Sequence, residues 1–259
     1  MSKQLISITD ITGYLYCPRK FWLKMQGVRE PLNKKMILGM IKHKIFDVFN
    51  KQDYLIIASI SQVLSKKELS SLYETDLIKI IDEICNQNEK MMESFSILKK
   101  EVLESMLKLT KREIELRVES ILKVLSRNIF GKELWRNLSP KYLTEVSIVN
   151  PELGLKGRVD RVQLDNNIIP YEIKTREEIY ESDRIQLAGY ALLLEKEFNK
   201  PVNFGIVEVE NKQEEIILDE KLKARVLELA EEIRNLKEPK FLNNFSKCEK
   251  CSLRDECFN

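Results

Sequence analysis

The sequence predicts an α/β protein in which a long helical segment precedes a sheet. Strand-type patterns occupy residues 141–174 and 203–218, the second as a hairpin with its turn at Asn211, and a helical pattern over residues 182–198 separates them. Between residues 61 and 137, apolar side chains recur every three or four positions among dense Lys and Glu, with almost no Gly or Pro. We therefore expect a helical insertion, assigned to residues 51–140, in front of a mixed sheet.

Length and composition support one complete globular core. The chain has 259 residues, of which 43% are hydrophobic and 32% charged, and its 8 Gly and 7 Pro are too few for a collagen-like or low-complexity protein. We expect residues 1–259 to form a single domain. The sequence contains no long uncharged apolar run and no signal-peptide pattern at its start, so we expect a cytoplasmic protein without a membrane segment.

The first helical pattern is interrupted near its middle. Residues 8–24 have helical spacing, but Pro18 breaks the pattern, so Cys17 is expected at the break. A second helix is predicted over residues 37–50, where Gly39 and His43 are four positions apart and share a face.

Two carboxylates on neighbouring predicted strands are candidate metal ligands. Glu172 and Lys174 are two positions apart on one strand, so they point to the same face. If residues 165–167 form a three-residue loop, Asp160 lies opposite Glu172 on that face, whereas a two-residue loop would separate them. Two adjacent carboxylates can bind Mg²⁺ or Mn²⁺, and Lys174 can orient an attacking water or offset phosphate charge.

An isolated motif of this kind is usually a surface salt bridge, and a single histidine is usually structural. Two further observations favour a functional site. Gln186 and Tyr190 follow one helical turn apart on the next predicted helix, and the only histidine, His43, lies upstream near Gly39.

Four of the five cysteines are placed as one set of metal ligands. Cys248, Cys251 and Cys257 form a C-x2-C-x5-C pattern, and Cys17 supplies a fourth thiol near the other end of the chain. Four thiolates suit an iron-sulfur cluster or a structural zinc, and spacing does not separate the two; a disulfide is disfavoured in the cytosol. Cys85 lies in an apolar helical pattern and is expected to be a buried thiol.

Taken together, these motifs resemble the RecB-like branch of the PD-(D/E)XK nucleases and, within it, the CRISPR-associated Cas-four exonucleases. The resemblance runs nearly end to end. It is carried, in order, by residues 16–21, 39–43, 157–160, 172–174 and 186–190 and by the last three cysteines.

The resemblance implies a restriction-endonuclease-like mixed sheet with a large helical insertion. It implies an iron-sulfur clamp in which residues 239–259 join Cys17, with a 4Fe-4S cluster on Cys17, Cys248, Cys251 and Cys257. It also implies a Mg²⁺ or Mn²⁺ ion held by His43, Asp160, Glu172 and the carbonyl of Ile173, with Lys174 as the catalytic lysine. Gln186 and Tyr190 would support the site or the DNA strand.

The activity implied is degradation of single-stranded DNA, from the 5′ end, with trimming or selection of new spacers beside the CRISPR integrase. The helical insertion is long for the shorter members, so we expect an arch over the active site or a surface for a partner. Three alternatives stay open: a stand-alone repair or viral RecB-like nuclease, a DNA-binding scaffold without nuclease activity, and a plain zinc-binding structural module.

The net charge of +2 does not by itself indicate a nucleic-acid ligand, since 43 basic residues nearly balance 41 acidic ones. Any DNA affinity therefore has to come from a local groove. The basic residues adjacent to the motifs are the expected contributors, namely Arg19, Lys20, Arg158, Arg161 and Arg184.

Overall fold

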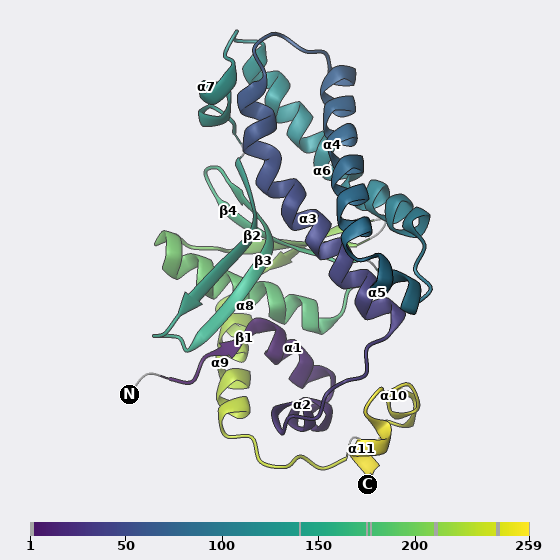
Figure 1. Cartoon of the computed structure of the whole chain (residues 1–259). Helices are drawn as coiled ribbons and strands as arrows, with labels where there is room; N and C mark the ends of the chain where they lie inside the picture. The colour runs from purple at the N-terminus through teal and green to yellow at the C-terminus, as the bar shows by residue number, and fades with distance from the viewer. Residues whose placement is uncertain are drawn as a thin grey trace. The chain divides into compact units, whose positions relative to one another are not determined.

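A computed structural model describes residues 3–139, 141–174, 176, 178–209, 212–241 and 244–258. The chain divides into two compact units, whose elements are labelled in Figure 1. One unit combines Met1–Pro31 with Tyr142–Asn259, and the other is Leu32–Lys141. We call them the sheet unit and the helical unit, and each is described by itself.

Within the described residues, six strands form a mixed sheet. They are β1 (Ile6–Ser7), β2 (Lys141–Asn150), β3 (Leu155–Leu164), β4 (Ile168–Ile173), β5 (Phe204–Val209) and β6 (Lys212–Ile217). The order is β1-β3-β4-β5-β6, and β2 pairs with β3. β1 is parallel to β3 and β4 is parallel to β5, whereas the β3–β4 and β5–β6 pairs are antiparallel. The predicted mixed sheet is confirmed.

The connection between β3 and β4 sets the register of the two strands. Leu164 lies opposite Ile168, so residues 165–167 form a three-residue loop, the case in which the sequence places the two carboxylates on one face. Continuing this register places Asp160 opposite Glu172. Because side chains alternate along a strand, both carboxylates point to the same face of the sheet.

Six helices are described in the sheet unit. They are α1 (Ile8–Tyr16), α2 (Pro18–Met25), α8 (Glu181–Phe198), α9 (Glu220–Arg234), α10 (Phe245–Glu249) and α11 (Arg254–Phe258). α8 packs on β3, β4 and β5 and also contacts α1 and α9 (Figure 1). Gly189 permits the contact with α1, because a Cβ atom there would lie 2.5 Å from Ile8 Cδ1. α8 is therefore a core helix, and it carries Gln186 and Tyr190.

The predicted break in the first helix is confirmed, and it fixes Cys17 at the start of α2. Pro18 occupies the first turn of α2, where its missing N–H removes no helical hydrogen bond. Cys17 has an extended backbone, with φ −162°, and its Sγ accepts the backbone N–H of Lys20 at 3.4 Å. The thiol thus caps α2.

The helical unit contains α3 (Lys34–Ser59), α4 (Lys66–Gln87), α5 (Glu89–Ser94), α6 (Lys99–Leu125) and α7 (Gly131–Arg136). α3 contacts α4, α6 and α7, and α4 contacts α6, around an apolar core of their own (Figure 1). Among the described residues, no helix has the length and hydropathy needed to cross a membrane.

The helical unit starts earlier than the expected insertion at residues 51–140. α3 extends beyond the predicted 37–50 helix at both ends. At its start, the Asn33 side chain accepts the backbone N–H of Met36 at 3.0 Å and caps the helix. At its end, apolar burial continues through Ile57, so the helix does not stop at residue 50.

Short elements account for what the sequence analysis missed. β1 has two residues, and α10 and α11 have five each, too few for a periodic pattern to be recognised. The predicted hairpin is present as β5 and β6, with Phe204 opposite Ile217. Its expected turn at Asn211 lies outside the described residues.

Candidate functional site

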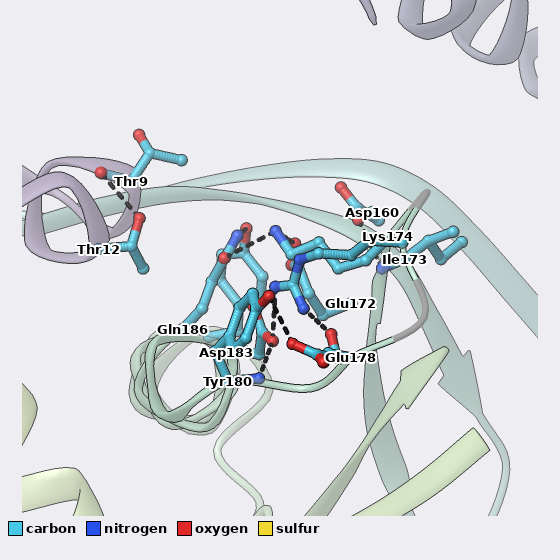
Figure 2. Close-up of polar contacts among 12 residues, drawn as sticks. Thr9, Thr12, Asp160, Glu172, Ile173, Lys174, Glu178, Tyr180, Asp183 and Gln186 are labelled. Carbon is cyan, nitrogen blue, oxygen red and sulfur yellow. Dashed lines mark hydrogen bonds and ion pairs between the residues drawn. The ribbon is translucent and has the colours of Figure 1, made fainter. Parts of the chain in front are cut away.

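The sheet unit brings together two acidic side chains from adjacent strands. Asp160 extends from β3 and Glu172 from β4 (Figure 2). Asp160 Oδ2 accepts the backbone N–H of Ile173 at 2.9 Å, and Glu172 is only 2% exposed. The predicted juxtaposition of the two carboxylates is confirmed, while their role as metal ligands stays a prediction.

The environment of Glu172 disfavours its charged form. Burial, followed by the nearby charge of Asp160, raises the pKa of Glu172 to about 8, although Lys174 acts in the opposite direction. Its Oε2 atom is buried and has no hydrogen-bond partner among the described residues. A second positive charge would relieve both conditions, so this acidic pair fits a divalent cation.

Lys174 links the carboxylates to α8. Its Nζ forms an ion pair with Glu172 and donates a hydrogen bond to Gln186 Oε1 at 3.2 Å (Figure 2). Its backbone N–H donates to the carbonyl of Glu208 at 2.8 Å, which fixes the end of β4 against β5. The ammonium group is therefore held beside the carboxylates by a strand and a helix together.

Gln186 connects Lys174 to Tyr190. Gln186 Nε2 donates to the Tyr190 hydroxyl at 2.8 Å, and both side chains are buried. Burial, with the charges of Glu172 and Asp160, raises the pKa of Tyr190 well above its usual value, so the ring is a neutral phenol. Of the two roles expected for this pair, the geometry favours support of the site over contact with a DNA strand.

His43 lies on α3 in the helical unit, whereas the carboxylates belong to the sheet unit. Its role as a fourth metal ligand stays a prediction, as does that of the Ile173 carbonyl. Within the described parts of the chain, no three His, Cys, Asp or Glu side chains gather at ligand spacing. The donors that lie together for a hard cation are Asp160 and Glu172.

The four cysteines expected to act together line one cavity. Its walls include Cys17 from α2's first turn and Cys248, Cys251 and Cys257 from the tail. Among the described residues, none of the four forms a disulfide. Burial, with the nearby Cys17 and Cys251, raises the pKa of Cys257, whereas Arg19 lowers it. The tail and the first helices therefore meet at a shared thiol-lined site, while Cys85 is buried in the helical unit as expected.

Two basic residues of α2 have partners within the sheet unit. Arg19 donates to Glu238 Oε1 and to the carbonyl of Pro239, both at 2.9 Å, and its guanidinium lies 4.0 Å from the centre of the Phe241 ring. Lys20 Nζ pairs with Glu30 at 2.6 Å. Arg19 fastens the tail to α2, so its surroundings differ from those of a groove residue that contacts DNA.

Arg161 is buried, contrary to its expected place in a DNA-binding groove. It is 1% exposed, pairs with Glu208 at 2.7 Å and stacks on the Tyr171 ring at 4.0 Å. The alternation of β3 turns it to the face opposite Asp160, where a strand partner neutralises it. Arg158 and Arg184 are exposed and form ion pairs with Glu145 and Glu214.

Sequence reasoning missed two residues beside the carboxylates. Asp183 is buried on α8 and pairs with Arg176 through both carboxylate oxygens, at 2.5 and 2.6 Å. Its Oδ2 also accepts the backbone N–H of Tyr180 at 2.7 Å, which caps the helix. An acidic residue in a first helical turn was the available signal, but it is common to many surface helices.

Comparison with known proteins gives one family. A model described as the PD-(D/E)XK nuclease superfamily matches residues 5–258. A curated relative, "CRISPR-associated exonuclease Cas4/endonuclease Cas1 fusion" of Leptospira interrogans serogroup Icterohaemorrhagiae serovar Lai (strain 56601), is 29% identical over 160 residues. The alignment covers 54% of this chain and 30% of that relative, so the chain spans under a third of its length.

A solved structure entitled "Crystal structure of SSO0001" is also similar. The identity is 20%, with 65% of this chain and 79% of the other covered, and the TM-score is 0.29. That likeness is too low to bear on function.

Proposed function

The chain belongs to the PD-(D/E)XK nuclease superfamily, and from that premise we propose that it is a metal-dependent exonuclease that degrades single-stranded DNA from the 5′ end. The observation that carries the proposal is the acidic pair of Asp160 and the buried Glu172, with Lys174 beside it. A surface salt bridge would be exposed on both sides, whereas here Glu172 is buried, and its Oε2 atom accepts no hydrogen bond that meets the geometric criteria within the described part of the chain. Burying a carboxyl group without full hydrogen bonding destabilises the fold, so its presence here favours a functional role.

In the proposed mechanism, Asp160 and Glu172 would hold Mg²⁺ or Mn²⁺, with His43 and the carbonyl of Ile173 as further ligands. The ion would supply Lewis acidity for activating a water. Lys174 Nζ orients the water or stabilises negative charge on the phosphate as the P–O bond breaks. Gln186 accepts a hydrogen bond from Lys174 and so restricts where the ammonium points.

We propose further that Cys17, Cys248, Cys251 and Cys257 hold a 4Fe-4S cluster. The four thiols line one cavity and, among the described residues, none of them forms a disulfide, which supports this. Bound there, the cluster would clamp the tail to α2 and contribute folding free energy. Anaerobically purified protein should be brown, and a colourless protein loaded with zinc would favour the structural zinc alternative.

The biological role that we propose is trimming or selecting prespacers in CRISPR adaptation, in the cytoplasm. The support is the name of the curated relative, in which a Cas4 exonuclease and a Cas1 endonuclease share one chain. On the same support we propose the CRISPR integrase as a partner. The helical unit is proposed as an arch or a partner surface within one nuclease domain.

The test uses oligonucleotides labelled at the 5′ or 3′ end, with Mn²⁺ or with EDTA. We expect metal-dependent release of short 5′-labelled products from single strands and slow cutting of blunt duplex. Metal-independent cleavage would refute the mechanism. Faster cleavage of blunt duplex would reject the proposed single-stranded substrate. Short products only from the 3′ label would reject the proposed 5′ polarity. Either result would still show nuclease activity.

A further inference from the structure

Between β4 and α8, the chain holds an aromatic ring at the surface of the sheet unit. Tyr180 is 49% exposed. The Arg176 guanidinium lies 4.3 Å from the centre of its ring, and its hydroxyl donates to Glu178 Oε2 at 2.8 Å. A surface tyrosine normally samples several rotamers, but the contact with the ring and the hydrogen bond from the hydroxyl together restrict this side chain.

A buried carboxylate anchors this arrangement. Asp183 is 1% exposed, and both of its oxygens bind Arg176 Nη2. Asp183 also accepts the Tyr180 backbone N–H at 2.7 Å, so one carboxylate fixes the guanidinium and the backbone that carries the ring. Charge-assisted bonds to a buried carboxylate are strong, and the free energy of leaving Asp183 unpaired opposes release of Arg176.

The anchored ring is connected to the carboxylates through α8, and Figure 2 draws both. Asp183 precedes Gln186 by about one turn of α8, and Gln186 binds Lys174. Asp183 is also one of the charges that raise the pKa of Glu172, so the two acidic groups are within electrostatic reach. A strand with a phosphate at Lys174 would run past the start of α8, where Tyr180 lies as the N-cap residue.

We propose that Tyr180, backed by Arg176, is a stacking surface for one unpaired base next to the phosphate that is cut. An aromatic face accepts any base, so it would bind strands without sequence preference. Only an unstacked base can lie on the ring, hence the surface selects single strands over duplex. The inference rests on the proposed nuclease function and adds a substrate-positioning residue to it.

The experiment measures cleavage and binding of a single-stranded oligonucleotide by full-length protein, using Tyr180→Ala and the matched Tyr180→Phe. Tyr180→Phe keeps the ring and loses only the bond to Glu178, so we expect nearly unchanged rates. Tyr180→Ala should lower kcat/KM by about 5-fold to about 100-fold, the range for loss of one stacked base. A series of oligonucleotides, each with one abasic position, then locates the stacked nucleotide.

At the stacked position, an abasic site should slow the wild type and leave Tyr180→Ala without a further loss. An equal loss for Tyr180→Ala on every oligonucleotide, the abasic series included, would overturn the proposal, because a purely structural defect behaves in that way. Equal rates for Tyr180→Ala and wild type would also overturn it while leaving the nuclease intact. A wild-type protein that cleaves no DNA would instead reject the proposed function.

Discussion

The backbone N–H of Ile173 donates to Asp160 Oδ2 at 2.9 Å, so the β3 carboxylate is attached to the strand that carries Glu172. The distance between the two acidic groups therefore depends on sheet pairing more than on flexible side chains. A metal bound between them would find its ligands already close together, which lowers the entropic cost of binding.

The ammonium of Lys174 is the first target for substitution. Lys174→Ala should lower DNA cleavage by at least about 100-fold, because the group expected to stabilise transition-state charge is removed. Lys196→Ala is a matched control, since Lys196 is an exposed lysine of α8 with one weak ion pair to Glu152 at 3.8 Å. Gel assays with 5′-labelled strands measure both. Cleavage by Lys174→Ala at the control's rate would remove Lys174 from the mechanism.

The raised pKa of Glu172 predicts how stability depends on pH in the metal-free protein. The folded-state pKa is about 8, against 4.5 for an ordinary glutamate, so the folded protein retains a proton that the unfolded chain loses. Stabilisation by that proton is complete below pH 4.5 and is lost as pH rises through about 8.

The melting temperature in EDTA should therefore fall as the pH rises over this range, and the decrease should be smaller for Glu172→Gln. Added Mn²⁺ should raise the melting temperature of the wild type more at about pH 8.5 than at about pH 6, because the metal competes with the proton. An identical Mn²⁺ effect in wild type and Glu172→Gln would contradict a metal site at this residue.

Arg19 is predicted to hold the tail in place. Arg19→Ala removes the bonds to Glu238 and Pro239 and the stacking on Phe241, and should cost about 1–3 kcal/mol of unfolding free energy. The tail should also be cut sooner in limited proteolysis. Arg184→Ala, which breaks an exposed ion pair with Glu214, is the control and should cost under about 1 kcal/mol. Equal tail protection in both variants would argue against this role of Arg19.

Two arginines of β3 should differ in what their substitution changes, stability for one and DNA binding for the other. Arg161→Ala leaves Glu208 without its buried partner and should cost about 3–5 kcal/mol, read from urea unfolding. Arg158 is exposed, so Arg158→Ala should weaken DNA binding, with a shallower dependence on salt, while any effect on stability comes from the lost ion pair with the largely buried Glu145 side chain. The prediction fails if Arg161→Ala unfolds like wild type, or if Arg158→Ala binds DNA with an unchanged salt slope.

The pairing of Asp160 with Glu172 could be predicted from the sequence for a three-residue loop, because the rules that set it are local, and the structure decided the loop length. The length of the loop at residues 165–167 fixes the register, and strand alternation then fixes the face. The break at Cys17 is equally local, since Pro18 forbids a continuous helix. These features follow from residues within a few positions of one another.

Only the tertiary structure decided which charged side chains face solvent. Arg161 is buried because Glu208, on a strand far along the chain, neutralises it, and Arg19 meets Glu238 in the tail for the same kind of reason. The Arg176 and Asp183 pair likewise depends on how the segment after β4 folds back onto α8. A sequence pattern shows which side chains carry charge, but the free energy of burying a charge depends on a partner that only the folded chain supplies.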